Sequence, residues 1–123
     1  MDELITFLRE RLDEDERVAS TAGDGGDCGT WTTTGETVDF DQYEISGFHP
    51  STGAHVARHD PARTLREVEA KKRILDELEG FIAEAEDLPQ DERNADKAEG
   101  FGILRLMALP YSDHPAYQEE WRP

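Results

Sequence analysis

Hydrophobic positions near the start of the chain repeat with the period of an α-helix. Charged residues occupy most other positions of this segment, whose apolar stripe consists of Leu4, Ile5, Leu8 and Leu12. This pattern is typical of an amphipathic helix that packs one face against a core. It predicts a helix over residues 2–20. The glycine-rich residues 21–29 that follow predict a loop.

The pattern changes to that of short strands after residue 30. Residues 31–34 are strand formers, and residues 35–36 favour a turn. Val38 and Phe40 then alternate with aspartates, as expected of a half-buried strand. These residues predict a β-hairpin.

A third extended segment is expected after a break in this alternation. Tyr43 and Ile45 lie on the opposite parity to the preceding strand, so we expect a bulge or break near Gln42. Residues 50–53 favour another turn, and residues 55–58 follow as a short strand or extended entry. The sequence therefore predicts a small antiparallel sheet of two or three strands.

The longest predicted element begins after Asp60. The Asp60 carboxylate can accept hydrogen bonds from the first helical turn, and Pro61 suits the first helical position. Strong helix formers continue to residue 79, with an apolar stripe of Val68, Leu75, Leu78 and Ile82. We expect a helix over residues 61–79, which reaches residue 85 if Gly80 is tolerated.

The last third of the chain predicts further helices. Asp91 is a candidate cap for one of them, and residues 101–109 form the most apolar segment, which we expect to be buried. We expect three of its side chains to enter the core: Phe101, Leu104 and Leu106. Asp113 repeats the capping pattern of Asp60 and predicts a short helix that runs through Trp121.

Together these elements predict one α+β domain over residues 1–123, with a loop at 21–29 and an acidic variable segment at 80–100. Its parts are an N-terminal helix, a small antiparallel β-sheet, a long central helix and C-terminal helices. The chain length suits a single domain with one modest core.

The balance of charge limits the classes of partner. The chain has 29 acidic and 13 basic residues and a formal net charge of −16. This excess disfavours direct binding to nucleic acid and to anionic membranes, and it favours a basic protein surface. The candidate partner-binding residues come from the acidic segment: Glu84, Glu86, Asp87, Asp91 and Glu92. The alternative is a solvated face that only keeps the protein soluble.

Two histidines are the main candidates for metal chemistry. His55 and His59 are four residues apart, which suits a metal-binding face on a helix. Pro61 disfavours a helical conformation for the preceding Asp60, so we expect this helical geometry to fail. The sequence therefore predicts no structural metal, no cofactor and no catalytic residue.

Cys28 is the only cysteine, so no disulfide can form within the chain. Its acidic neighbours disfavour a reactive thiolate. The sequence has no signal-peptide pattern, and its longest apolar run is too short to span a bilayer. We expect a reduced, cytoplasmic protein.

Three segments resemble an uncharacterised family of small actinobacterial proteins that also occurs in actinophages, domain of unknown function 6221. They are LITFLRERLDEDE at residues 4–16, ARHDPARTLREVEAKKRIL at 57–75 and LRLMALPYSDHPAYQEEWRP at 104–123. The resemblance implies a bacterial or phage-borne protein and brings no activity. Members often carry Cys and His between the long helix and the LPY sequence, but residues 80–102 contain neither. A zinc site is therefore not transferred to this chain.

These observations favour a noncatalytic, acidic, macromolecule-binding protein of a bacterium or phage. A more specific version is a nucleic-acid mimic that inhibits a DNA-binding protein of the host. The alternative is a small metal-dependent or hydrolytic enzyme that uses His55, His59 and nearby carboxylates.

Overall fold

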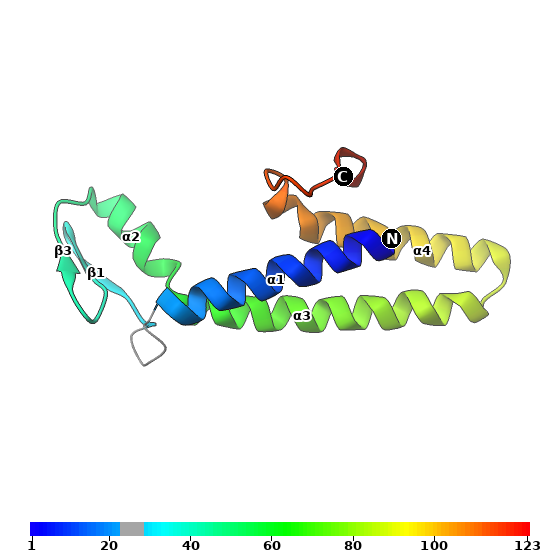
Figure 1. Ribbon diagram of the computed structural model, residues 1–123, viewed down its shortest axis with the longest axis horizontal. Coiled ribbons are helices and arrows are strands. Elements are labelled where there is room, and N and C mark those ends of the chain that lie inside the picture. The colour runs from blue at the N-terminus through cyan, green and yellow to red at the C-terminus, as the bar shows by residue number, and fades with distance from the viewer. Residues whose placement is uncertain (23–28) are drawn as a thin grey trace. The chain divides into compact units, whose positions relative to one another are not determined.

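The computed structural model describes residues 1–22 and 29–123 (Figure 1). Most of the predicted loop, including Cys28, lies outside the described residues. The described ranges form four α-helices, a three-stranded antiparallel sheet and three short 3₁₀ helices, which confirms the α+β class. The chain divides into two compact units. We call residues 13–70 the sheet unit, and residues 1–12 with 71–123 the helical unit.

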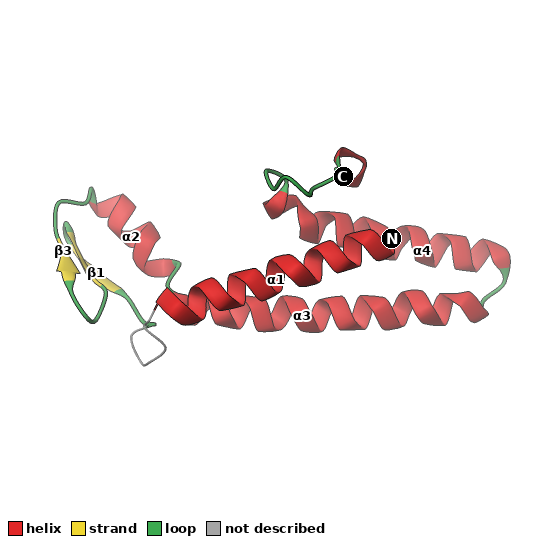
Figure 2. Cartoon of the chain, viewed as in Figure 1, coloured by secondary structure: helices red, strands yellow, loops and turns green. Residues whose placement is uncertain are grey.

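The sheet unit contains the predicted hairpin and a third strand. β1 (Thr32–Thr34) pairs with β2 (Thr37–Asp39), and β2 pairs with β3 (Glu44–Ile45), in the order β1-β2-β3 (Figure 2). The predicted break lies beside Gln42, where Asp41 has a φ of 74°. The Asp41 N–H donates to the Asp39 carboxylate at 2.8 Å, which stabilises this left-handed turn.

The prediction of a turn at residues 50–53 and an extended segment at 55–58 is wrong. These residues form helix α2 (Pro50–Arg58). His49 caps this helix, because its Nδ1 accepts a hydrogen bond from the Ser51 N–H, and Pro50 occupies the first helical turn. A Cβ on Gly53 would lie 3.1 Å from Thr33 Oγ1, so glycine lets α2 approach β1 closely.

The predicted cap of the central helix is confirmed. α3 spans Pro61–Glu84, and Asp60 Oδ1 accepts a hydrogen bond from the Arg63 N–H at 2.8 Å. The other carboxylate oxygen, Oδ2, accepts from the Trp31 N–H at 3.1 Å. Asp60 is only 8% exposed. One buried carboxylate therefore fixes both the start of α3 and the chain that leads into β1.

The helical unit combines the first residues of α1 (Asp2–Ala22) with the second half of α3 and with α4 (Gln90–Ala108). A 3₁₀ helix at Ala85–Asp87 lies between α3 and α4. A Cβ on Gly100 would lie 2.9 Å from Ile82 Cγ1, so α4 approaches α3 closely at this glycine. The buried side chains of this unit are Leu4, Phe7, Leu8, Leu12, Leu75, Leu78, Ala85, Leu104, Ala108 and Trp121.

The predicted burial of residues 101–109 is only partly correct. Leu104 and Ala108 are fully buried, but Leu106 is 59% exposed. The segment belongs to α4, and a helix that packs one face places Leu106 on the opposite side from Leu104. The cap of α4 is Pro89 rather than Asp91, which lies within the first turn.

The predicted helix from Asp113 to Trp121 is also wrong. This segment contains turns and a 3₁₀ helix at Glu119–Trp121. His114 stabilises the turn, since its Nδ1 accepts a hydrogen bond from the Ala116 N–H at 3.0 Å. Arg105 Nε donates to the Trp121 carbonyl oxygen at 3.2 Å, so a contact with α4 helps to hold the segment.

Candidate functional site

The five candidate acidic residues gather around the turn that joins α3 to α4 (Figure 1). Glu84 ends α3, Glu86 and Asp87 belong to the 3₁₀ helix, and the remaining two lie in the first turn of α4. All five are exposed. We call this set, which consists of Glu84, Glu86, Asp87, Asp91 and Glu92, the hairpin-tip carboxylates.

Local electrostatics stabilise this concentration of negative charge. Asp91 and Glu92 lie at the N-terminus of α4, where the helix dipole favours anions. Glu86 forms an ion pair with Lys97. The hydrogen bond from Lys97 lowers the pKa of Glu86, and the charges of Lys97 and Arg93 act in the same direction. The tip is therefore anionic at neutral pH.

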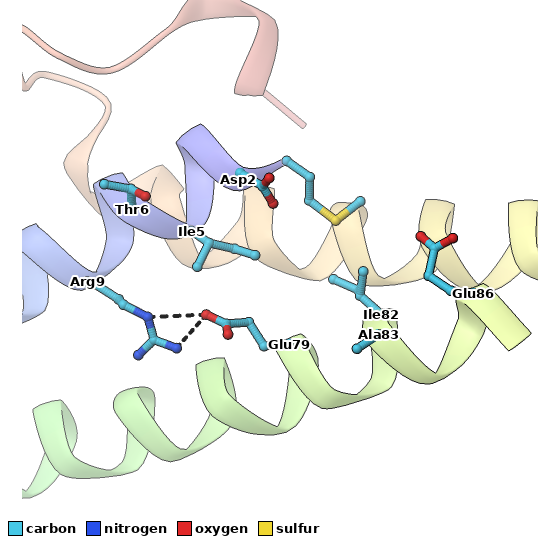
Figure 3. Close-up of a pocket in the computed structure, with 9 residues that line it drawn as sticks. Asp2, Ile5, Thr6, Arg9, Glu79, Ile82, Ala83 and Glu86 are labelled. Atoms are coloured by element: carbon cyan, nitrogen blue, oxygen red, sulfur yellow. Dashed lines mark hydrogen bonds and ion pairs between the residues drawn. The ribbon is translucent and has the colours of Figure 1, made fainter.

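A groove between α1 and α3 begins at Glu86. Figure 3 shows this α1/α3 groove, which has a volume of about 450 Å³. Ile5 of α1 and Ile82 of α3 point into the space between the two helices. The groove is lined by Met1, Asp2, Ile5, Thr6, Arg9, Glu79, Ile82, Ala83 and Glu86. It thus has an apolar floor, and Glu86 belongs both to its rim and to the hairpin tip.

Arg9 closes one end of the groove through two carboxylates of α3. Its Nε donates to Glu79 Oε1 at 3.2 Å, and its Nη2 donates to Asp76 Oδ1 at 3.0 Å (Figure 3 draws the bonds to Glu79). These hydrogen bonds, first that to Glu79, raise the pKa of Arg9. The three side chains are between 41% and 66% exposed, so each pair contributes only about 0–1 kcal/mol to stability. Their geometry shows that Glu79 is placed to bind a guanidinium group.

A second hollow, of about 360 Å³, lies on the other side of the first turns of α1. It is bounded by Phe7 and Trp121 and by the acidic Asp2, Glu3 and Glu10. The Phe7 and Trp121 ring centroids are 5.1 Å apart. Phe7 was not among the residues of the predicted apolar stripe. Its spacing of three residues from Leu4 is a signal for the same buried face.

The two candidate metal ligands meet in the sheet unit. His55 lies in α2, His59 caps its C-terminus, and their ring centroids are 4.3 Å apart. The i,i+4 contact therefore persists, although the backbone leaves the helical conformation at His59. The His59 Nδ1 forms a hydrogen bond with the His55 carbonyl oxygen at 2.9 Å. Within residues 1–22 and 29–123, no group of three or more His, Cys, Asp or Glu side chains is arranged to hold a metal ion.

His59 also borders a smaller cavity of about 260 Å³ in the sheet unit. Trp31 and Pro61 contribute to its walls. Asp60, which lies next to His59, is already committed to the cap of α3 and to the Trp31 N–H. Its carboxylate is therefore engaged in structural hydrogen bonds.

The described part of the chain contains no helix that is both long enough and apolar enough to cross a membrane. A family model described as "Family of unknown function (DUF6221)" matches residues 1–123. No curated protein and no solved structure matches the chain.

Proposed function

We propose that this chain, which belongs to the family of unknown function DUF6221, is a noncatalytic protein that binds a basic surface of another macromolecule. The binding site in this proposal consists of the hairpin-tip carboxylates and the adjoining α1/α3 groove. No activity is assigned to this family, so the proposal rests on the chemistry of this site.

The observation that supports the proposal is that the hairpin-tip carboxylates adjoin the α1/α3 groove, with its apolar floor, at Glu86. Exposed carboxylates alone are well solvated and bind weakly in physiological salt. An apolar floor adds about 25 cal/mol for each Å² that a partner removes from water. The carboxylates would then attract and orient a cationic partner, and the groove would supply affinity.

A more specific form of the proposal concerns the kind of partner. A surface with this charge could replace nucleic-acid phosphates on a DNA-binding host protein and so inhibit it. The resemblance to actinobacterial and actinophage proteins supports a cytoplasmic role in a bacterium or an infected cell. We favour binding over the metal-dependent or hydrolytic alternative because, among the described residues, His55 and His59 are not joined by a third ligand.

A capture experiment with two matched charge-reversal variants tests the proposal. The tip variant carries Glu84→Lys, Asp87→Lys and Asp91→Lys. The control carries Glu36→Lys, Glu44→Lys and Glu120→Lys, which are also exposed, so both variants change the net charge by the same amount. Each protein is immobilised and exposed to an actinobacterial lysate, and captured proteins are quantified by mass spectrometry.

We expect the unaltered protein and the control variant to retain the same basic protein, and the tip variant to lose it. Raising the salt concentration should weaken this capture. Equal retention by the tip variant would refute a binding role for the hairpin tip. Loss from both variants would show that only the net charge matters.

A further inference from the structure

We infer that the α1/α3 groove receives an amphipathic, cationic helix of a partner protein. This inference rests on the proposed function and specifies the partner. It concerns the shape and chemistry of the groove, whereas the capture experiment above tests the hairpin tip.

The floor of the groove fits the apolar face of a helix. Ile5 and Ile82 come from two different helices and are each partly exposed, and Ala83 is exposed beside them. The volume of about 450 Å³ can accommodate a few side chains. Two helices with apolar residues between them offer the kind of groove into which a third helix packs.

The rim of the groove selects the charge of this helix. Among the described residues that line the groove, Asp2, Glu79 and Glu86 supply three carboxylates, Arg9 is the one basic side chain, and Met1 carries the N-terminal amino group. Arg9 is already held by Glu79 and Asp76. Within the described ranges the Asp2 carboxylate forms no hydrogen bond and no ion pair, so it can meet a cation without breaking an existing contact.

The contact between Arg9 and Glu79 provides an internal example of the expected recognition. The Arg9 side chain reaches from α1 to α3 at the end of the groove, where its guanidinium group meets the Glu79 carboxylate (Figure 3). A partner helix with Leu in the groove and Lys or Arg three or four residues away would place one cation toward Asp2 and another toward Glu86, where it would share the carboxylate with Lys97.

The same charges disfavour other occupants. A second copy of this chain carries a net charge of −16 and would repel the rim. Nucleic acid and anionic lipid surfaces would be repelled as well. A cationic protein segment is the occupant that satisfies both the apolar floor and the rim.

The test uses a fluorescein-labelled helical peptide of Leu and Lys, roughly 14 residues long, in which the Leu side chains form one stripe and the Lys side chains flank that stripe. A second peptide has the same composition in an order that does not segregate them. Binding is measured by fluorescence anisotropy. The blocking variant is Ala83→Trp, which fills the groove without a change of charge. Its control is Ala98→Trp, at an exposed position of α4 outside the groove.

We expect the amphipathic peptide to bind the unaltered protein at least about tenfold more tightly than Ala83→Trp, and Ala98→Trp to match the unaltered protein. Thermal unfolding of each variant is measured in parallel. Thr6→Trp blocks the groove from the α1 side and replaces Ala83→Trp if that variant unfolds.

Several results would overturn the inference. They are undetectable binding of the peptide, equal binding of the unsegregated peptide, and unchanged affinity in the blocked variants. A dimer in sedimentation that dissociates on blocking would identify a second copy as the occupant and would equally overturn it. The capture experiment with the tip variant judges the proposed function separately, because none of its substitutions lines the groove.

Discussion

Asp60 shows how a single residue can connect local and tertiary structure. Its carboxylate caps α3 through the Arg63 N–H and also accepts the Trp31 N–H from a segment 29 residues away. The first bond is predictable from the sequence because Asp-Pro is a local helix-start signal. The second bond depends on tertiary structure and has no signal in the sequence.

We predict that Asp60→Ala lowers the free energy of unfolding by about 2–4 kcal/mol, because it removes a cap and leaves a part-buried N–H without an acceptor. The measurement is chemical denaturation. Asp113→Ala is the control: Asp113, two residues before Pro115, was also predicted to cap a helix, but it is exposed and begins no helix. An equally large loss in the control would contradict the special role of Asp60.

Two helical glycines should respond in opposite directions to alanine. Gly80 has open space where a Cβ would be placed, whereas a Cβ on Gly100 would meet Ile82 Cγ1 at 2.9 Å. Gly80→Ala should stabilise the protein by about 0.5–1 kcal/mol, because alanine favours helix and restricts the unfolded chain. Gly100→Ala should destabilise it by about 1–3 kcal/mol through overpacking. Denaturant midpoints that shift in the same direction would refute this difference.

The ion pair of Glu86 predicts a change in titration. Lys97 holds the pKa of Glu86 below its ordinary value. The associated stability is therefore present above the ordinary pKa and is lost as pH falls through the lowered one. Lys97→Gln should raise the pKa of Glu86, as measured by carbon NMR of its carboxylate. The pKa of Glu119, which is lowered by Arg122, serves as the internal reference and should not move. An unchanged Glu86 titration would exclude the ion pair.

At the scale of elements, periodicity predicted the helices well where one apolar stripe dominates. The N-terminal helix was expected over residues 2–20 and spans Asp2–Ala22. The central helix was expected over residues 61–79, or to residue 85 if Gly80 is tolerated, and it continues past Gly80 and ends at Glu84. The prediction of a turn and an extended segment at residues 50–58 was wrong because a glycine such as Gly53 usually disfavours a helix. It is tolerated there because its small size lets α2 lie close to β1.

The C-terminal elements were predicted less well because neighbouring segments determine them. Residues 101–109 are almost uniformly apolar, so composition alone could not show which face is buried. After Leu109 the chain is held by Phe7 and Arg105 rather than by a regular helix. Such contacts between distant residues leave no periodic pattern in the sequence.

A pair of leucine substitutions checks the assigned face of α4. Leu104 is fully buried and Leu106 is 59% exposed. Leu104→Ala should cost roughly 2–5 kcal/mol, because it leaves a cavity in the helical unit. Leu106→Ala should change stability by no more than about 0.5 kcal/mol. Similar losses for both variants in urea denaturation would show that the buried face has been assigned incorrectly.

At the scale of the whole molecule, the charge of −16 was the clearest property of the sequence, and it pointed to the acidic segment. Those five carboxylates lie around one turn because they are close together in the sequence. The α1/α3 groove could not be predicted in the same way, because it joins Asp2 and Ile5 to residues of α3 more than seventy positions away. Only Glu86 belongs to both sets, and this residue connects the predicted site to the groove.

The most direct test of the binding role is site-specific photo-crosslinking in an actinobacterial host. A crosslinking amino acid replaces Gln90, an exposed uncharged residue beside the hairpin tip. In the control it replaces the exposed Thr34 of β1. The proposal predicts a covalent adduct with one basic protein from position 90 and none from position 34. Adducts from position 34 alone, or equal adducts from both positions, would contradict a partner-binding site at the hairpin tip.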